Sequence, residues 1–138
     1  MKKIALLMIF CTALALLLSG CGGTSAPDPE KIVPTRETLI ENLKNAGYSV
    51  EELDSAEGSP LTLDRVIARK GESFIDIVYG LSADEAAEVF ELYRGFYPDN
   101  YYILARNGNY VYCAGDRAAF KKAGFKSTEN VGVQYIHG

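Results

Sequence analysis

The pattern of apolar and polar positions divides the chain into three parts. After two lysines, a nearly unbroken apolar run extends from Ile4 to Leu18. Residues 22–34 contain three prolines and two glycines without a periodic apolar pattern, which is typical of a linker with a reach of about 40 Å. From residue 35 onward helical and strand periods alternate, so we expect a single domain over residues 35–138.

Three helix starts can be located in this domain. Thr35, Ser82 and Asp116 each precede a segment with helical spacing of its apolar residues. Ser82 is the strongest of them because Glu85 follows three residues later, which completes a capping box. The predicted helices run to about residues 46, 94 and 123, where the glycines at positions 47, 95 and 124 end them.

A first hairpin is predicted around Gly71-Glu72, between β-rich runs at residues 63–70 and 73–79. A two-residue turn places four apolar side chains on the core face: Val66, Ala68, Ile75 and Ile77. Arg69 and Asp76 then fall on the opposite face. We expect that face to be wet, with Asp76 as a surface partner of Arg69.

A second hairpin is predicted around Asn107-Gly108, between residues 101–106 and 109–114. The turn pairs Ala105 with Tyr110 and Ile103 with Tyr112. Residues 48–50 are a weak strand candidate, and the tail from Lys126 either adds a strand at residues 131–136 or frays. Because hairpins outnumber crossovers, we expect an α+β fold: a mainly antiparallel sheet with two to three helices packed on one face, a two-layer sandwich.

Residues 1–20 have the layout of a secretion signal, with a basic start, an apolar middle and small residues before a cysteine. Leu18-Ser19-Gly20-Cys21 resembles the lipobox of bacterial lipoproteins at every position. That resemblance implies cleavage between Gly20 and Cys21 and a covalent lipid on the Cys21 thiol. It places the protein at the cell membrane, lipid-anchored and facing outside the cytoplasm. An uncleaved anchor or an ordinary cleaved signal also leaves the domain outside.

Charge and cysteine content limit the classes of partner and the disulfides that the chain can have. Removing the signal lowers the number of basic side chains from 14 to 12 against 18 acidic ones, so the mature chain carries a net charge near −6. This balance argues against nucleic acid and against a polybasic membrane-hugging surface. With Cys11 removed and Cys21 lipidated, Cys113 is the one remaining thiol, so we expect no intramolecular disulfide.

The search for catalytic chemistry finds little. His137 stands at the end of the chain, and Cys113 alternates with apolar residues as a small buried residue would. The acidic residues between Glu51 and Pro60 lack the spacing of a calcium loop, and a solvated loop is the better interpretation. We therefore predict no catalytic residues, no metal and no cofactor beyond the lipid on Cys21.

Tyrosine is the feature that stands out, since seven of the nine lie between Tyr79 and Tyr112. In the predicted hairpin, Tyr101, Tyr110 and Tyr112 share one face. If that face is exposed, these amphipathic rings suit a peptide- or glycan-binding surface. The alternative is cross-strand packing, with the rings covering the sheet or buried under a helix.

Residues 35–125 are similar to small lipoproteins of Clostridia-type bacteria. The shared pattern is a strand pair, then a helix with the Ser82-Ala83-Asp84 start, then a tyrosine-rich hairpin. The resemblance implies no activity. We expect a non-enzymatic binding or accessory module of the envelope, with a protein, peptide or glycan partner. The alternatives are a hydrolase inhibitor or small envelope enzyme, and a purely structural envelope component.

Overall fold

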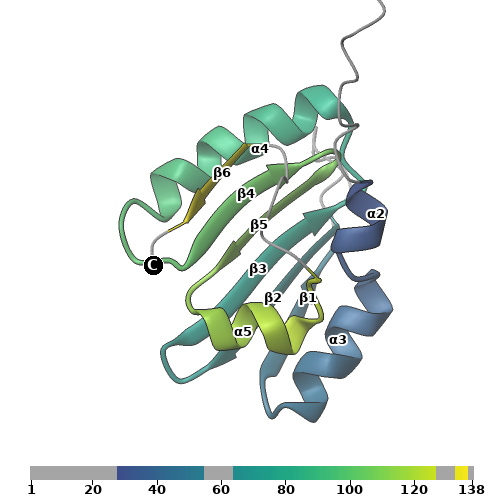
Figure 1. Cartoon of the computed structure of the whole chain (residues 1–138), viewed down its shortest axis with the longest axis vertical. Coiled ribbons are helices and arrows are strands. Elements are labelled where there is room, and N and C mark those ends of the chain that lie inside the picture. Colours follow the sequence, from purple (N-terminus) through teal and green to yellow (C-terminus); the bar gives the residue numbers. More distant parts are fainter. Residues whose placement is uncertain (1–27, 55–63, 127–132, 137–138) are drawn as a thin grey trace, which may run out of the picture.

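The computed structural model describes residues 28–54 and 64–126, together with the backbone of residues 133–136. Its centre is a six-stranded sheet in the order β1-β2-β3-β5-β4-β6, with antiparallel pairing throughout. The α+β class and the antiparallel sheet predicted from the sequence are thus confirmed (Figure 1). The elements are α2 (Pro29–Ile32), α3 (Arg36–Asn45), β1 (Ser49–Leu53), β2 (Asp64–Lys70), β3 (Ser73–Tyr79), α4 (Ala83–Phe96), β4 (Ile103–Asn107), β5 (Tyr110–Ala114), α5 (Arg117–Ala123) and β6 (Val133–Ile136).

The two hairpins follow their turn residues. In the β2–β3 hairpin Ala68 pairs with Ile75, as expected for a two-residue turn with Gly71 at φ 60°. In the β4–β5 hairpin the turn is Gly108-Asn109 instead of Asn107-Gly108, because Gly108 takes the first central position at φ 57°. The register therefore moves by two residues. A shift of two leaves the paired residues of β4 and β5 on their predicted faces, whereas Tyr101, which precedes β4, lies on the other side.

The predicted helix caps are all present. Thr35 and Asp116 accept hydrogen bonds from the backbone N–H three residues later, and Ser82 and Glu85 form the reciprocal capping box. At the end of α3, the Tyr48 N–H donates to the Leu43 carbonyl at 2.9 Å, which is the bond expected for a Schellman ending. Only α4 overruns its predicted end: it passes through Gly95 to Phe96.

The helices do not share one face of the sheet, so the expected two-layer sandwich is wrong. α3 and α5 cover one face, where their side chains pack with Ile77, Ala105 and Tyr112. α4 covers the other face, over Leu104 and Val111. Figure 1 shows α3 and α5 side by side, with α4 separated from them by the strands. The central strands are apolar on both sides, and each side needs its own cover, which gives three layers.

The folded domain also begins earlier than residue 35. Residues 29–34, assigned to the linker from composition, form α2 and the connection to α3. Ile32 and Val33 are buried, and the Ile32 carbonyl accepts a hydrogen bond from the Lys126 N–H at 3.2 Å. The Tyr79 hydroxyl donates to the Pro34 carbonyl at 3.1 Å. The proline-rich composition reflects a short packed segment here, and residues 22–27 of the predicted linker lie outside the described residues.

We expect Ile32→Ala to lower the free energy of unfolding by about 2–4 kcal/mol, because it empties a packed site. The measurement is urea denaturation followed by circular dichroism. Lys31→Ala, at an exposed neighbouring position, is the matched control and should change stability by no more than about 0.5 kcal/mol. Equal, small effects at both positions would contradict the assignment of α2 to the fold.

Candidate functional site

The three tyrosines predicted as a binding face do not form one. Tyr112 is fully buried under α5, Tyr110 is partly buried, and Tyr101 packs in the α4 layer on the other side of the sheet. Burial raises the pKa of Tyr112 to about 12. The prediction of an exposed tyrosine face is wrong, because helices cover both sides of the hairpin.

A buried carboxylate lies between the sheet and α4 instead. Asp76, in the middle of β3, is 0% exposed and accepts four hydrogen bonds. Arg65 of β2 donates two of them, at 2.9 and 2.6 Å, in a bidentate ion pair. The hydroxyls of Tyr93 and Tyr97 donate the others at 2.5 and 2.6 Å. Asp76 is therefore not the surface partner of Arg69 that the strand pattern suggested.

The surroundings of Asp76 keep its partners in their donating forms. The hydrogen bond to Asp76 raises the pKa of the Arg65 guanidinium above its ordinary value. Burial, together with the nearby carboxylate, raises the pKa of Tyr93 and Tyr97 well above that of a free tyrosine. Both hydroxyls thus stay protonated at neutral pH, and a buried charge with this many donors is compensated in place.

The Asp76 cluster fixes the position of aromatic rings that reach the surface. Tyr97 stacks on Phe74 with ring centroids 5.2 Å apart. Phe74 in turn lies directly on the Gly115 backbone, where an added Cβ would come within 2.5 Å of the ring. The Arg69 guanidinium lies 5.8 Å from the centre of the Phe74 ring. The buried carboxylate thus positions Tyr97, and Tyr97 positions Phe74.

The Phe74 ring borders an open groove of about 970 Å³ at one end of the sheet. The groove lies where β3 and β4 begin and where β5 ends. Its volume is at the upper end of the range typical of ligand sites. The lining residues are Arg69, Glu72, Ser73, Phe74, Asp99, Asn100, Tyr101, Tyr102, Gly115 and Asp116.

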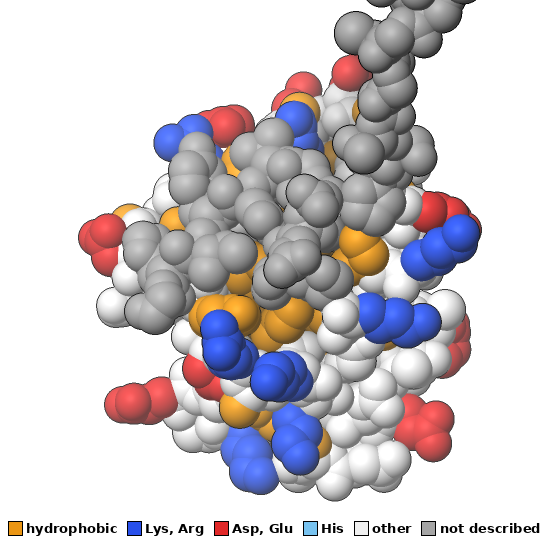
Figure 2. Space-filling view, viewed as in Figure 1, with side chains coloured by type: hydrophobic (Ala, Val, Ile, Leu, Met, Phe, Trp, Pro, Cys, Tyr) orange, Lys and Arg blue, Asp and Glu red, His pale blue; other side chains and the backbone are white. Residues whose placement is uncertain are grey.

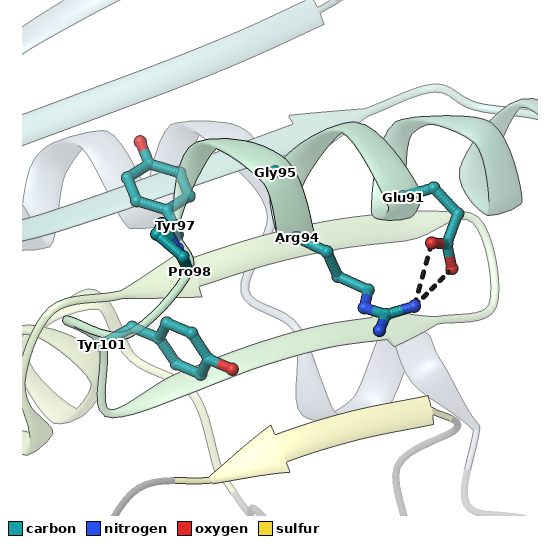
Figure 3. Close-up of a pocket in the computed structure, with 6 residues that line it drawn as sticks. All are labelled: Glu91, Arg94, Gly95, Tyr97, Pro98 and Tyr101. Atoms are coloured by element: carbon teal, nitrogen blue, oxygen red, sulfur yellow. Dashed lines mark hydrogen bonds and ion pairs between the residues drawn. The ribbon is translucent and has the colours of Figure 1, made fainter.

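A second, smaller depression of about 390 Å³ adjoins the groove and shares Tyr101 with it. Its rim carries an ion pair between Glu91 and Arg94 at 2.9 Å. Figure 3 shows the Tyr97 hydroxyl turned away from Tyr101, consistent with its hydrogen bond to Asp76. The α4–β4 connection therefore contributes to both hollows.

The groove combines aromatic surface with exposed polar groups. Phe74 and Tyr102 are half-buried and offer ring area, and Tyr102 is held by its edge-to-face contact with Phe120 at 5.9 Å. Tyr101 lines the groove from a buried position. Glu72 and Asp99 are exposed, and neither has an ion pair or hydrogen bond with another described residue. Held rings beside unoccupied acceptors can bind an extended ligand by contact area and hydrogen bonds.

Most of the remaining residues singled out in the sequence are buried, paired or outside the described residues. Cys113 is fully buried, and burial raises the pKa of its thiol well above the ordinary value, so the reactive thiolate is disfavoured. Among the described residues no cluster of three His, Cys, Asp or Glu side chains is arranged to hold a metal. His137, Gly20 and Cys21 lie outside the described residues, as does most of the acidic loop. Of that loop, Glu52 and Asp54 are described and both pair with Arg36.

No family model, curated protein or solved structure matches this chain. Within the described residues, no helix combines the length and apolar character needed to cross a membrane.

Sequence reasoning missed the groove, although two signals pointed toward it. Asp76 interrupts an apolar strand, which marks a charge that the fold has to pair. The segment Tyr97-Pro98-Asp99-Asn100-Tyr101-Tyr102 concentrates aromatic and polar residues in a connection between a helix and a strand. Connections of that kind often carry binding residues. The tyrosine enrichment was a real signal, but it belongs to this connection and not to the hairpin face.

We expect Asp76→Ala to lower the free energy of unfolding by about 3 kcal/mol or more. The change leaves the Arg65 guanidinium, the buried Tyr93 hydroxyl and the partly buried Tyr97 hydroxyl without their acceptor. Asp99→Ala, which removes an exposed carboxylate from the groove, should change stability by no more than about 0.5 kcal/mol. Urea denaturation of both variants is the measurement. A cost for Asp76→Ala no larger than that for Asp99→Ala would contradict the proposed importance of the cluster.

Proposed function

We propose that this protein is a lipid-anchored, extracytoplasmic binding module of the cell envelope, and that it is not an enzyme. Its binding site is the groove beside Phe74, Tyr101 and Tyr102. The observation that carries the proposal is the groove itself, whose Phe74 ring is held through Tyr97 by the buried Asp76 and whose Tyr102 ring is held by Phe120.

The anchor is supported by the N-terminal sequence. Leu18-Ser19-Gly20-Cys21 supplies the leucine, the two small residues and the cysteine that a lipobox needs. The covalent lipid would be carried by Cys21, eight residues before α2 begins at Pro29. At roughly 0.8 kcal/mol for each buried methylene, two acyl chains hold a protein stably in a bilayer.

The position of the groove suits a tethered binder. The described chain begins at Asp28, and α2 lies against the β4–β5 turn, because a Cβ at Gly108 would meet the Pro29 ring at 2.8 Å. The groove lies at the opposite end of β5, a strand that spans about 17 Å. The groove therefore lies at the end of the sheet away from the start of the described chain, where a partner can reach it.

The lining of the groove supports binding by contact area and hydrogen bonds. Aromatic side chains bury large areas with little loss of conformational entropy, which is why binding surfaces use them. Phe74 and Tyr102 are already ordered by their packing on Tyr97 and Phe120, so a ligand would not have to order them. A protein, peptide or glycan of the envelope fits this chemistry.

The anchor is tested by replacing each cysteine of the N-terminal segment in turn. We expect Cys21→Ala to abolish incorporation of a labelled fatty acid, because it removes the acceptor thiol. Cys11→Ala is the matched control and should still incorporate the label. The measurement is labelling in a bacterial host, followed by mass spectrometry of the mature N-terminus. Label that persists in Cys21→Ala, or a wild-type chain without lipid, would rule the anchor out.

The groove is tested with a photo-crosslinking amino acid, p-benzoylphenylalanine, at Asn100 in the full lipidated chain. We expect one or a few discrete adducts in cells, because Asn100 lines the groove and is exposed. The matched control carries the same amino acid at Glu41, an exposed position on α3 remote from the groove, and should give none of these adducts. Identical adducts at both positions would contradict the groove as the binding site and favour a structural envelope component.

A further inference from the structure

The exposed face of α5 is basic throughout. Arg117, Lys121 and Lys122 are exposed on this helix, and Lys126 follows just after it. None of the four has a carboxylate partner among the described residues; Arg117 instead donates to the Tyr102 hydroxyl at 3.3 Å. Figure 2 shows Lys and Arg side chains gathered around α5 on the face it occupies. We call these four residues the α5 basic row.

The groups that pack beside this row do not neutralise it. The Asp116 carboxylate is engaged in capping α5 through the Ala119 N–H. From α3, the side chain that faces α5 is the neutral Asn42, whose amide donates to the Ala123 carbonyl. α3 exposes Glu37 and Glu41 elsewhere on its surface. The groups beside the row thus leave its four basic side chains without a carboxylate partner among the described residues.

The helix on the opposite layer carries the opposite charge. α4 holds four acidic residues, Asp84, Glu85, Glu88 and Glu91, against the single basic residue Arg94. On the same side, Arg69 and Arg106 of the strands lie beside Phe74 and Phe90. The acidic helix α4 and the basic helix α5 therefore cover different faces of the sheet. The net charge of the chain, which argued against a basic membrane surface, conceals this separation.

The basic row also lies next to the anchored end of the chain. The Lys126 N–H donates to the carbonyl of Ile32 in α2, so the end of the row adjoins the start of the described chain. Pro29 follows Cys21 by only eight positions, a reach of at most about 28 Å. A lipid on Cys21 would therefore hold α5 close to the headgroups.

We propose that the α5 face rests on the anionic phospholipid surface in which Cys21 is anchored. This inference rests on the lipid anchor proposed above. Attraction between the row and the negative headgroups, and repulsion of α4 from them, both turn the α5 layer toward the membrane. The α4 layer then faces away from the bilayer, and the groove at the end of the sheet stays accessible from the side.

The test places a fluorescent probe on each layer of the full lipidated protein in vesicles. Ala118→Cys labels the exposed side of α5, and Leu92→Cys, 52% exposed, labels α4. Because Cys113 is buried and Cys21 would carry the lipid, the introduced cysteine is the accessible thiol among the described residues. Lipids with a spin label on the headgroup quench a probe that lies close to the surface.

We expect strong quenching of the probe at Ala118→Cys and little quenching at Leu92→Cys. The quenching at Ala118→Cys should require phosphatidylglycerol, an anionic lipid, in vesicles made otherwise of phosphatidylcholine. High salt should reduce it. In the Ala118→Cys background, Lys121→Gln with Lys122→Gln should lower the equilibrium constant for docking about 25-fold, at roughly fivefold per charge. Arg94→Glu on α4 changes the net charge by the same amount and should not weaken docking.

Three results would overturn the inference while the anchor stands: equal quenching on both layers, quenching independent of lipid charge, or equal effects of the two charge changes. A response at Ala118→Cys only when soluble poly(glycerol phosphate) is added would assign the row to an anionic wall polymer and would likewise overturn it. Failure of the anchor is recognised separately, because mass spectrometry of the same preparation would then show Cys21 without lipid.

Discussion

The Asp76 carboxylate is the interaction on which the α4 layer and the groove both depend. Apolar contacts alone would attract α4 to the sheet, but such contacts are non-directional and leave its position loosely defined. Four hydrogen bonds to one buried carboxylate are directional, and they join β2, β3, the last turn of α4 and the residue that follows it. We infer that this cluster contributes positional specificity more than net stability, since burying charge is costly even when the charge is paired. Through Tyr97 and Phe74 that specificity extends to the wall of the groove.

Local signals predicted much of the fold because their physical causes are local. A capping box needs only Ser82 and Glu85, and a two-residue turn needs only a residue such as Gly71 that accepts a positive φ. These signals located the main helices and both hairpins. Even the register error at Gly108 was harmless to the face assignment, because the shift was an even number of residues.

The site could not be predicted in the same way, because its partners are distant in sequence. The strand period shows that Arg69 and Asp76 share a face, but it does not reveal what covers that face. α4 covers that face of the sheet. Tyr93, Tyr97 and Arg65 donate hydrogen bonds to Asp76, whereas Arg69 lies over the Phe74 ring. The sequence did not predict the early start of the folded domain for a similar reason. Three prolines suggested a linker, whereas Ile32 and Val33 find apolar surface that only the folded domain provides.

The net charge of the chain also failed to predict the α5 basic row, because it is a sum over all residues. A membrane surface responds only to the charged side chains that face it. A lipid on Cys21 would already supply far more binding energy than the four residues of the α5 basic row, which contribute about 1 kcal/mol each near an anionic surface. The row is therefore not needed for retention at the membrane. For a domain that cannot leave the membrane, however, about 4 kcal/mol between two orientations corresponds to a population ratio of about 1,000. If Cys21 carries that lipid, a charge difference between α4 and α5 that is too weak to anchor the protein would still be strong enough to decide which layer faces outward, and with it the side from which a partner would reach the groove.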